Sequence, residues 1–145
     1  MDRTLKLLTW PAALFIAGVL LWYEQFKLAG NQGSVELFTT ITTWLHIPAY
    51  EAQMRLGVAW AEIAASVLVI NQPSRIWGAA GALALMSGAI FFHVASPLGI
   101  DPYNDGGTLF KEACAVWLAS AFILAAYRVE LIALLRRVPG ARRAE

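Results

Sequence analysis

The sequence predicts an all-α integral membrane protein, a four-helix bundle with a short amphipathic helix on its outer surface. Apolar residues make up 59% of the 145 residues and charged residues only 14%, which is far from the balance of a soluble domain. Most of the apolar residues fall into four runs, and only one of these runs contains a charge. We therefore expect a single membrane domain over residues 1–145.

The four runs cover residues 7–23, 56–74, 76–100 and 113–127. With its flanks, each supplies the ~20 residues that a membrane-spanning helix needs. None of the runs shows the alternation of polar and apolar residues that a β-barrel strand would have. Lipid offers no hydrogen-bond partners to backbone N–H and C=O groups, so the spans are predicted to be helical. With their ends added, the expected helices cover residues 7–29, 50–71, 75–97 and 108–136.

Basic residues are spread unevenly over the ends and connections. Eight of the eleven lysines and arginines lie at the N-terminus, in the connection after the second span, or beyond the fourth span. By the positive-inside rule these three places are cytoplasmic. We therefore expect both termini in the cytoplasm, with a basic cytoplasmic tail over residues 137–145.

The segment 34–46, between the first two spans, is too short and too polar to cross a bilayer. Ser34 is a possible N-cap, and Phe38, Ile41 and Leu45 share one helical face. A β-branched run in the middle of the segment favours a strand instead, but no second strand is available to pair with it. We predict an interfacial amphipathic helix that could cover the outer end of the bundle.

The connection 97–107 is rich in turn-forming residues and contains two aspartates. Its spacing is not that of an EF-hand loop, so we predict plain turns rather than a calcium site. The whole chain contains one cysteine and two histidines, which excludes a disulfide within the chain and a cysteine-rich metal centre. No metal site is predicted.

Glu62, Arg55 and Glu51 form a polar stripe on the second span. At 100° per residue the three side chains fall within about 40° of one another, and Glu62 lies roughly 10 Å deeper than Arg55. Glu51 and Arg55 have the spacing of a helical ion pair. A carboxylate as deep as Glu62 costs roughly 2.5–3.5 kcal/mol to insert, and without a partner it would be expected to bind a proton.

Titratable residues on the other three spans lie toward the same outer side. Glu24 and Lys27 end the first span, His93 is near the end of the third, and Lys111 and Glu112 open the fourth. Sites in membrane bundles are built from facing helices in this way. We take Glu62, His93, Arg55 and Lys27 as candidates for ligand binding or proton relay, with Glu24, Glu51, Lys111 and Glu112 as secondary candidates.

Each candidate also has a plain alternative. The side chains of Lys27, Lys111 and Arg55 could simply reach the lipid headgroups. His93 could be a neutral histidine bonded to a backbone carbonyl group. For Glu62, a functional role is at least as well supported as a structural one because of its depth.

Four stretches of the sequence resemble the DoxX family of small bacterial membrane proteins. They are residues 15–30 with the outer segment that follows, residues 57–62 with their terminal glutamate, residues 75–80, and residues 88–93. They follow one another in the family's order within residues 10–130. The positions that match the family's motifs are Lys27, Glu62, Arg75 and His93.

This resemblance implies a multi-pass protein of the bacterial inner membrane, often an accessory subunit of a membrane redox system. Some relatives are quinone-linked and others act with oxidant-defence enzymes. We expect a pocket around Glu62, Arg55 and His93, with quinone as a possible ligand and no covalently bound cofactor. The sequence has no paired cysteines and no nucleotide-binding motif, so a self-sufficient enzyme is not predicted.

The expected partners are membrane lipids and a second membrane or membrane-associated subunit, and a homo-oligomer is also possible. No nucleic-acid-binding motif is present. Two other classes of function remain open at this stage. One is a small-molecule transporter or permease, although four helices without an evident inverted repeat leave little room for alternating access. The other is a structural scaffold in which Glu62 and Arg55 hold the helices together.

Overall fold

The computed structural model describes residues 3–137, and all regular structure in that range is helical. In chain order the elements are α1 (Arg3–Leu28), α2 (Gln32–Trp44), the 3₁₀ turn η1 (Pro48–Tyr50), α3 (Glu51–Ile70), the 3₁₀ turn η2 (Gln72–Ser74), α4 (Arg75–Ala95), α5 (Thr108–Ala126) and α6 (Arg128–Arg137). The predicted all-α class is confirmed.

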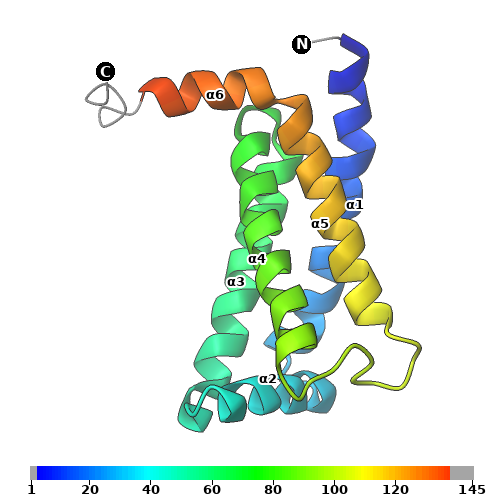
Figure 1. Cartoon of the computed structure of the whole chain (residues 1–145), viewed down its shortest axis with the longest axis vertical. Coiled ribbons are helices and arrows are strands. Elements are labelled where there is room, and N and C mark those ends of the chain that lie inside the picture. The colour runs from blue at the N-terminus through cyan, green and yellow to red at the C-terminus, as the bar shows by residue number, and fades with distance from the viewer. Residues whose placement is uncertain (1–2, 138–145) are drawn as a thin grey trace.

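Helices α1, α3, α4 and α5 form the bundle, and each is long and apolar enough to cross a membrane. Each of the four packs against its two neighbours, in the order α1, α3, α4, α5 and back to α1. Helix α2 lies across one end of the bundle, and α6 turns away at the opposite end, where α1 begins (Figure 1). The predicted four-helix bundle with an additional outer helix is therefore confirmed.

Large apolar side chains on the outside of every span fit a lipid environment. They include Leu7, Leu14, Trp60, Val67, Phe91, Val94 and Leu118, each more than half exposed. So many exposed apolar side chains around one bundle would be a liability in water, whereas hydrocarbon solvates them. The chain is therefore a multi-pass membrane protein whose outer surface contacts lipid.

The interior near the α6 end is packed with small and branched side chains. Ile16 from α1, Val69 from α3 and Ile123 from α5 are completely buried there. Gly78 lets α4 approach α3 closely, because a Cβ atom at this position would lie 2.2 Å from the backbone nitrogen of Val69. The short η2 turn thus joins two helices in backbone contact, as small residues allow in membrane bundles.

Helix α2 confirms the helical interpretation of the outer segment but begins earlier than predicted. Its N-cap is Asn31, whose side chain accepts a hydrogen bond from the Gly33 amide at 3.1 Å. The predicted cap Ser34 is instead buried within the helix. The β-branched run is compatible with a helix because the Thr42 hydroxyl donates to the Phe38 carbonyl at 2.8 Å. The side chains of Phe38 and Ile41 also pack inward.

The fourth predicted helix, residues 108–136, is divided into two. Helix α5 ends at Ala126, and α6 runs across the end of the bundle (Figure 1). Tyr127 at the junction is buried, and the segment after it has charged residues on both sides of the apolar run 131–135. Such a mixed segment suits the membrane interface better than the hydrocarbon, which explains the turn. Most of the predicted basic tail, residues 138–145, lies outside the described range.

The connection between α4 and α5 forms turns, as predicted. Asp101 accepts hydrogen bonds from the amides of Asp105 at 2.9 Å and Gly106 at 3.2 Å. Desolvation raises the pKa of Asp101, but hydrogen bonds from Gly107, Asp105 and Gly106 outweigh it and hold the pKa below its usual value. Between residues 3 and 137, no group of three or more potential ligands could hold a metal ion.

Candidate functional site

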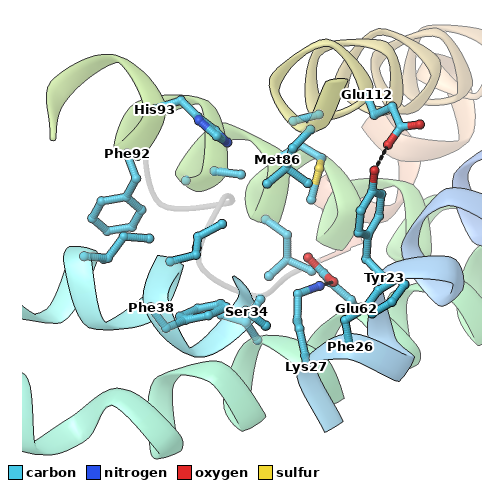
Figure 2. A pocket seen from close by; sticks show the side chains of 18 of the residues that line it. Tyr23, Phe26, Lys27, Ser34, Phe38, Glu62, Met86, Phe92, His93 and Glu112 are labelled. Carbon is cyan, nitrogen blue, oxygen red and sulfur yellow. Dashed lines mark hydrogen bonds and ion pairs between the residues drawn. The ribbon is translucent and has the colours of Figure 1, made fainter. Parts of the chain in front are cut away.

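A cavity of about 620 Å³ occupies the bundle interior at the α2 end. All four spans and α2 contribute to its wall, and α2 covers its end. Its lining is mostly apolar and includes Leu20, Phe26, Phe38, Ile41, Met54, Val58, Met86 and Phe92. The polar lining residues are Tyr23, Lys27, Asn31, Ser34, Glu62, His93, Tyr103 and Glu112, several of which are labelled in Figure 2. An apolar cavity with a few converging polar groups is the usual form of a small-molecule site.

Lys27 and Glu62 form an ion pair at the wall of this cavity (Figure 2). Lys27 lies in the last turn of α1 and Glu62 near the middle of α3, so two neighbouring spans supply the pair. The Lys27 ammonium is also 3.1 Å from the Glu24 carboxylate. The structure therefore joins three predicted candidates, and Glu62 is not the unpaired carboxylate that its sequence position suggested.

These three side chains are shielded from solvent by the bundle. The exposed fraction of the side chain is 5% for Glu24, 7% for Glu62 and 14% for Lys27. Lys27 therefore does not simply reach out to the headgroups. Its ammonium group has three N–H donors, of which two serve the carboxylates, so a third is available at the cavity wall.

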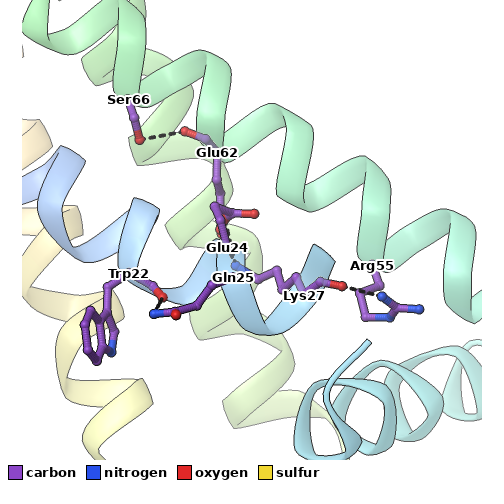
Figure 3. Close-up of polar contacts among 7 residues, drawn as sticks. All are labelled: Trp22, Glu24, Gln25, Lys27, Arg55, Glu62 and Ser66. Carbon is purple, nitrogen blue, oxygen red and sulfur yellow. Dashed lines mark hydrogen bonds and ion pairs between the residues drawn. The ribbon is translucent and has the colours of Figure 1, made fainter. Parts of the chain in front are cut away.

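Arg55 does not line the cavity, contrary to prediction. Its guanidinium donates to Glu51 at 2.7 Å. It also donates to the backbone carbonyl of Lys27 (Figure 3). The C-terminal carbonyls of a helix lack partners within the helix and attract cations, which explains why Arg55 turns toward the end of α1. The Glu51–Arg55 pair predicted from spacing is confirmed within α3. The bond from Arg55 to the Lys27 carbonyl ties α3 to α1 outside the cavity.

His93 lines the cavity and is also bonded to the backbone, which was the plain alternative for this residue. Its Nδ1 atom lies 2.6 Å from the carbonyl oxygen of Gly99. A carbonyl can only accept, so Nδ1 carries the proton, and in the neutral ring Nε2 is then an acceptor. Nε2 makes no hydrogen bond to the described part of the chain.

Tyr23 is a site residue that the sequence did not reveal as one. Its hydroxyl donates to the carboxylate of Glu112, and both residues line the cavity (Figure 2). The spacing from Tyr23 to Lys27 is one helical turn, a signal that could have placed Tyr23 on the same face. Of the secondary candidates, Glu112 belongs to the cavity, whereas Lys111 is exposed and outside its lining.

Tyr103 closes the cavity from the side of the α4–α5 connection. Its hydroxyl donates to the Gly33 carbonyl at 3.1 Å, which joins this connection to the start of α2. Burial, together with the nearby charges of Glu36 and Asp105, raises the pKa of the Tyr103 phenol. The hydroxyl therefore stays protonated at neutral pH and keeps donating.

Arg75 is not part of this site, although the family resemblance carried it over. It is completely buried at the α3–α4 junction. Its guanidinium donates hydrogen bonds to the Val69 carbonyl at 3.0 Å, the Ile70 carbonyl at 3.2 Å and the Thr9 hydroxyl at 3.0 Å. The guanidinium also lies 4.1 Å from the centre of the Trp10 ring. Since it satisfies the last carbonyls of α3, Arg75 stabilises the fold at the end of the bundle away from α2.

Four spanning helices around a cavity that is mostly apolar define the class of this chain as a multi-pass membrane protein with an internal pocket. The chain matches no family model, no curated protein and no solved structure.

Proposed function

We propose that this chain is an accessory subunit of a membrane redox system and binds the head of a quinone in the cavity. The observation that carries the proposal is the ion pair of Lys27 and Glu62 at the wall of an apolar cavity of about 620 Å³. A quinone has the matching character, since it is apolar except for carbonyl oxygens that accept hydrogen bonds.

Two polar groups of the cavity suit a quinone in its two redox forms. The third N–H of Lys27 can donate to a quinone carbonyl oxygen, and the Nε2 atom of His93 can accept from a quinol hydroxyl. The apolar lining, with Phe26, Phe38 and Phe92, suits the ring and the start of an isoprenoid tail. These contacts orient the ligand and exclude water from it.

Reduction of a quinone consumes electrons and protons in equal number. The sequence has no paired cysteines and no nucleotide-binding motif, so the electrons would come from a partner subunit. This chain would hold the quinone and supply protons from its buried carboxyl groups. That division of work agrees with the resemblance to the DoxX family.

The same proposal places the protein in the bacterial inner membrane. The positive-inside rule assigns the α6 end of the bundle to the cytoplasm, because Lys6, Arg75 and Arg128 lie toward that end. The cavity and α2 then lie toward the periplasmic face. A partner that delivers electrons to this site would dock near α2.

Quinone binding can be tested with the purified chain in lipid nanodiscs. Decylubiquinone should quench tryptophan fluorescence saturably, and Lys27→Met should raise the Kd about tenfold, which corresponds to ~1.4 kcal/mol for a hydrogen bond from a charged donor. Lys111→Met is the matched control, since this lysine is exposed and outside the cavity. Absence of saturable quenching, or an equal Kd for Lys27→Met and wild type, would overturn the proposal.

A further inference from the structure

The buried polar cluster at the cavity wall contains more negative than positive groups. The Lys27 ammonium contacts Glu62 and lies 3.1 Å from Glu24. Both carboxyl groups are buried, with exposed side-chain fractions of 5% for Glu24 and 7% for Glu62. Figure 3 shows the three side chains converging between α1 and α3.

No other charged group of the described chain compensates the second carboxylate. On α3, the Arg55 guanidinium serves Glu51 and the Lys27 carbonyl group. On α5, Glu112 accepts from Tyr23 and brings another negative charge to the cavity wall. On α4, His93 is bonded to Gly99, and the charged residue of α2, Glu36, is exposed. One ammonium therefore faces two buried carboxyl groups.

A buried charge without a partner is so costly that the group takes up a proton instead. One oxygen of Glu24, Oε2, is buried and has no hydrogen-bond partner within the described residues. We propose that Glu24 and Glu62 share one exchangeable proton, which the cavity holds in reserve for its ligand. The proton belongs to the pair, because the two carboxyl groups are coupled through the same ammonium.

The role of this shared proton rests on the proposed function, because the proton would serve a bound quinone. A quinone oxygen that becomes negative on reduction would draw the proton from the pair. The carboxyl O–H bond then breaks, a quinol O–H bond forms, and Lys27 neutralises one of the two carboxylates left behind. Glu24 thereby joins Glu62 as a proton donor.

The shared proton can be measured without any ligand, by infrared spectroscopy of the protein in nanodiscs. At neutral pH the wild type should show the C=O stretch of a protonated carboxyl group, with the shift in D₂O that marks an exchangeable proton. Both Glu24→Gln and Glu62→Gln should lose this band, because each leaves one carboxylate neutralised by Lys27. Glu36→Gln, at an exposed carboxylate on α2, should keep it.

Lys27→Met gives a second readout with the opposite sign. Without the ammonium both carboxyl groups should be protonated, so the band area should rise about twofold. Size-exclusion profiles and melting curves identify variants that remain folded. The proposal is overturned if the wild type lacks the band, if the band survives in either glutamine variant, or if it stays unchanged in a folded Lys27→Met variant.

The outcome is separable from that of the quinone experiment. A band that behaves as expected, together with no saturable quinone binding, would leave the shared proton established and remove the quinone as its acceptor. Quinone binding without the band would support the cavity as the quinone site and would show that the proton comes from another group.

Discussion

Gly78 is the glycine at which the packing of this bundle leaves the least room for a Cβ atom. A Cβ atom there would lie 2.2 Å from the nitrogen of Val69 and 2.6 Å from the carbonyl carbon of Leu68. Both contacts are with backbone, so no side-chain rotation can relieve them. At Gly81, one turn further along α4, a Cβ atom would make only an ordinary contact of 3.6 Å with Ala65.

Gly78→Ala should therefore destabilise the protein by about 1–3 kcal/mol, the usual cost of overpacking, because α3 and α4 must move apart. Gly81→Ala should be nearly neutral or slightly stabilising. Thermal melting in detergent, followed by circular dichroism, measures both variants. Equal melting temperatures for the two would contradict the close contact of the helices.

Arg75 is the second residue on which the fold depends. Its guanidinium holds two carbonyl groups at the end of α3 and the Thr9 hydroxyl of α1. Arg75→Gln leaves at least one buried acceptor without a donor, so the free energy of unfolding should fall by about 1–3 kcal/mol. Arg128→Gln, at an exposed arginine, is the matched control. Unchanged melting of the Arg75 variant would show that water or lipid serves those carbonyls equally well.

At the scale of elements, α2 and the α4–α5 connection together cover the cavity. The Tyr103 hydroxyl joins them through the Gly33 carbonyl. Tyr103→Phe removes that bond, so amide exchange at the start of α2 should accelerate about fivefold, which corresponds to a net hydrogen-bond contribution of ~1 kcal/mol. Tyr50→Phe alters an exposed tyrosine and should leave the exchange unchanged. No difference between the two variants would show that α2 is held by its apolar face alone.

The same connection should respond to acid in a defined direction. The pKa of Asp101 is held below its usual value, so its hydrogen bonds stabilise the turn above the unfolded-state pKa, and that contribution is lost as pH falls through the lower folded-state pKa. We expect the NMR amide signals of Asp105 and Gly106 to move together, with a midpoint below about 3.9. In Asp101→Asn these signals should not titrate in this way. A midpoint above that value would contradict the capping role.

For the whole molecule, four spans place the start of α1 and helix α6 on the same side of the membrane, and this topology can be measured. Helix α6 lies at the end of the bundle where α1 begins, and α2 covers the other end (Figure 1). With Cys114 replaced by alanine, a cysteine at position 36 on α2 should react with an impermeant maleimide in whole spheroplasts. A cysteine at position 128 on α6 should react only after the membrane is permeabilised. The reverse labelling pattern would show that α2 and the cavity lie toward the cytoplasm.

The sequence by itself determined the class of the fold and the position of the polar stripe. Four apolar runs require four spans, and the Glu51–Arg55 pair follows from helical spacing alone. These features are local, because hydropathy and spacing act within about a turn or a span. Glu62 could be recognised from the same local pattern, because it is a charged residue inside the apolar run 56–74.

Only the tertiary structure decided which groups meet. Lys27 reaches Glu62 across 35 residues, and Tyr23 reaches Glu112 across 89. Such contacts depend on the order of neighbouring helices and on the rotation of each about its axis, which are set by packing over the whole bundle. The same packing turned Arg55 away from the cavity and buried Arg75 at the other end, because the free carbonyls at the ends of α1 and α3 lay within reach.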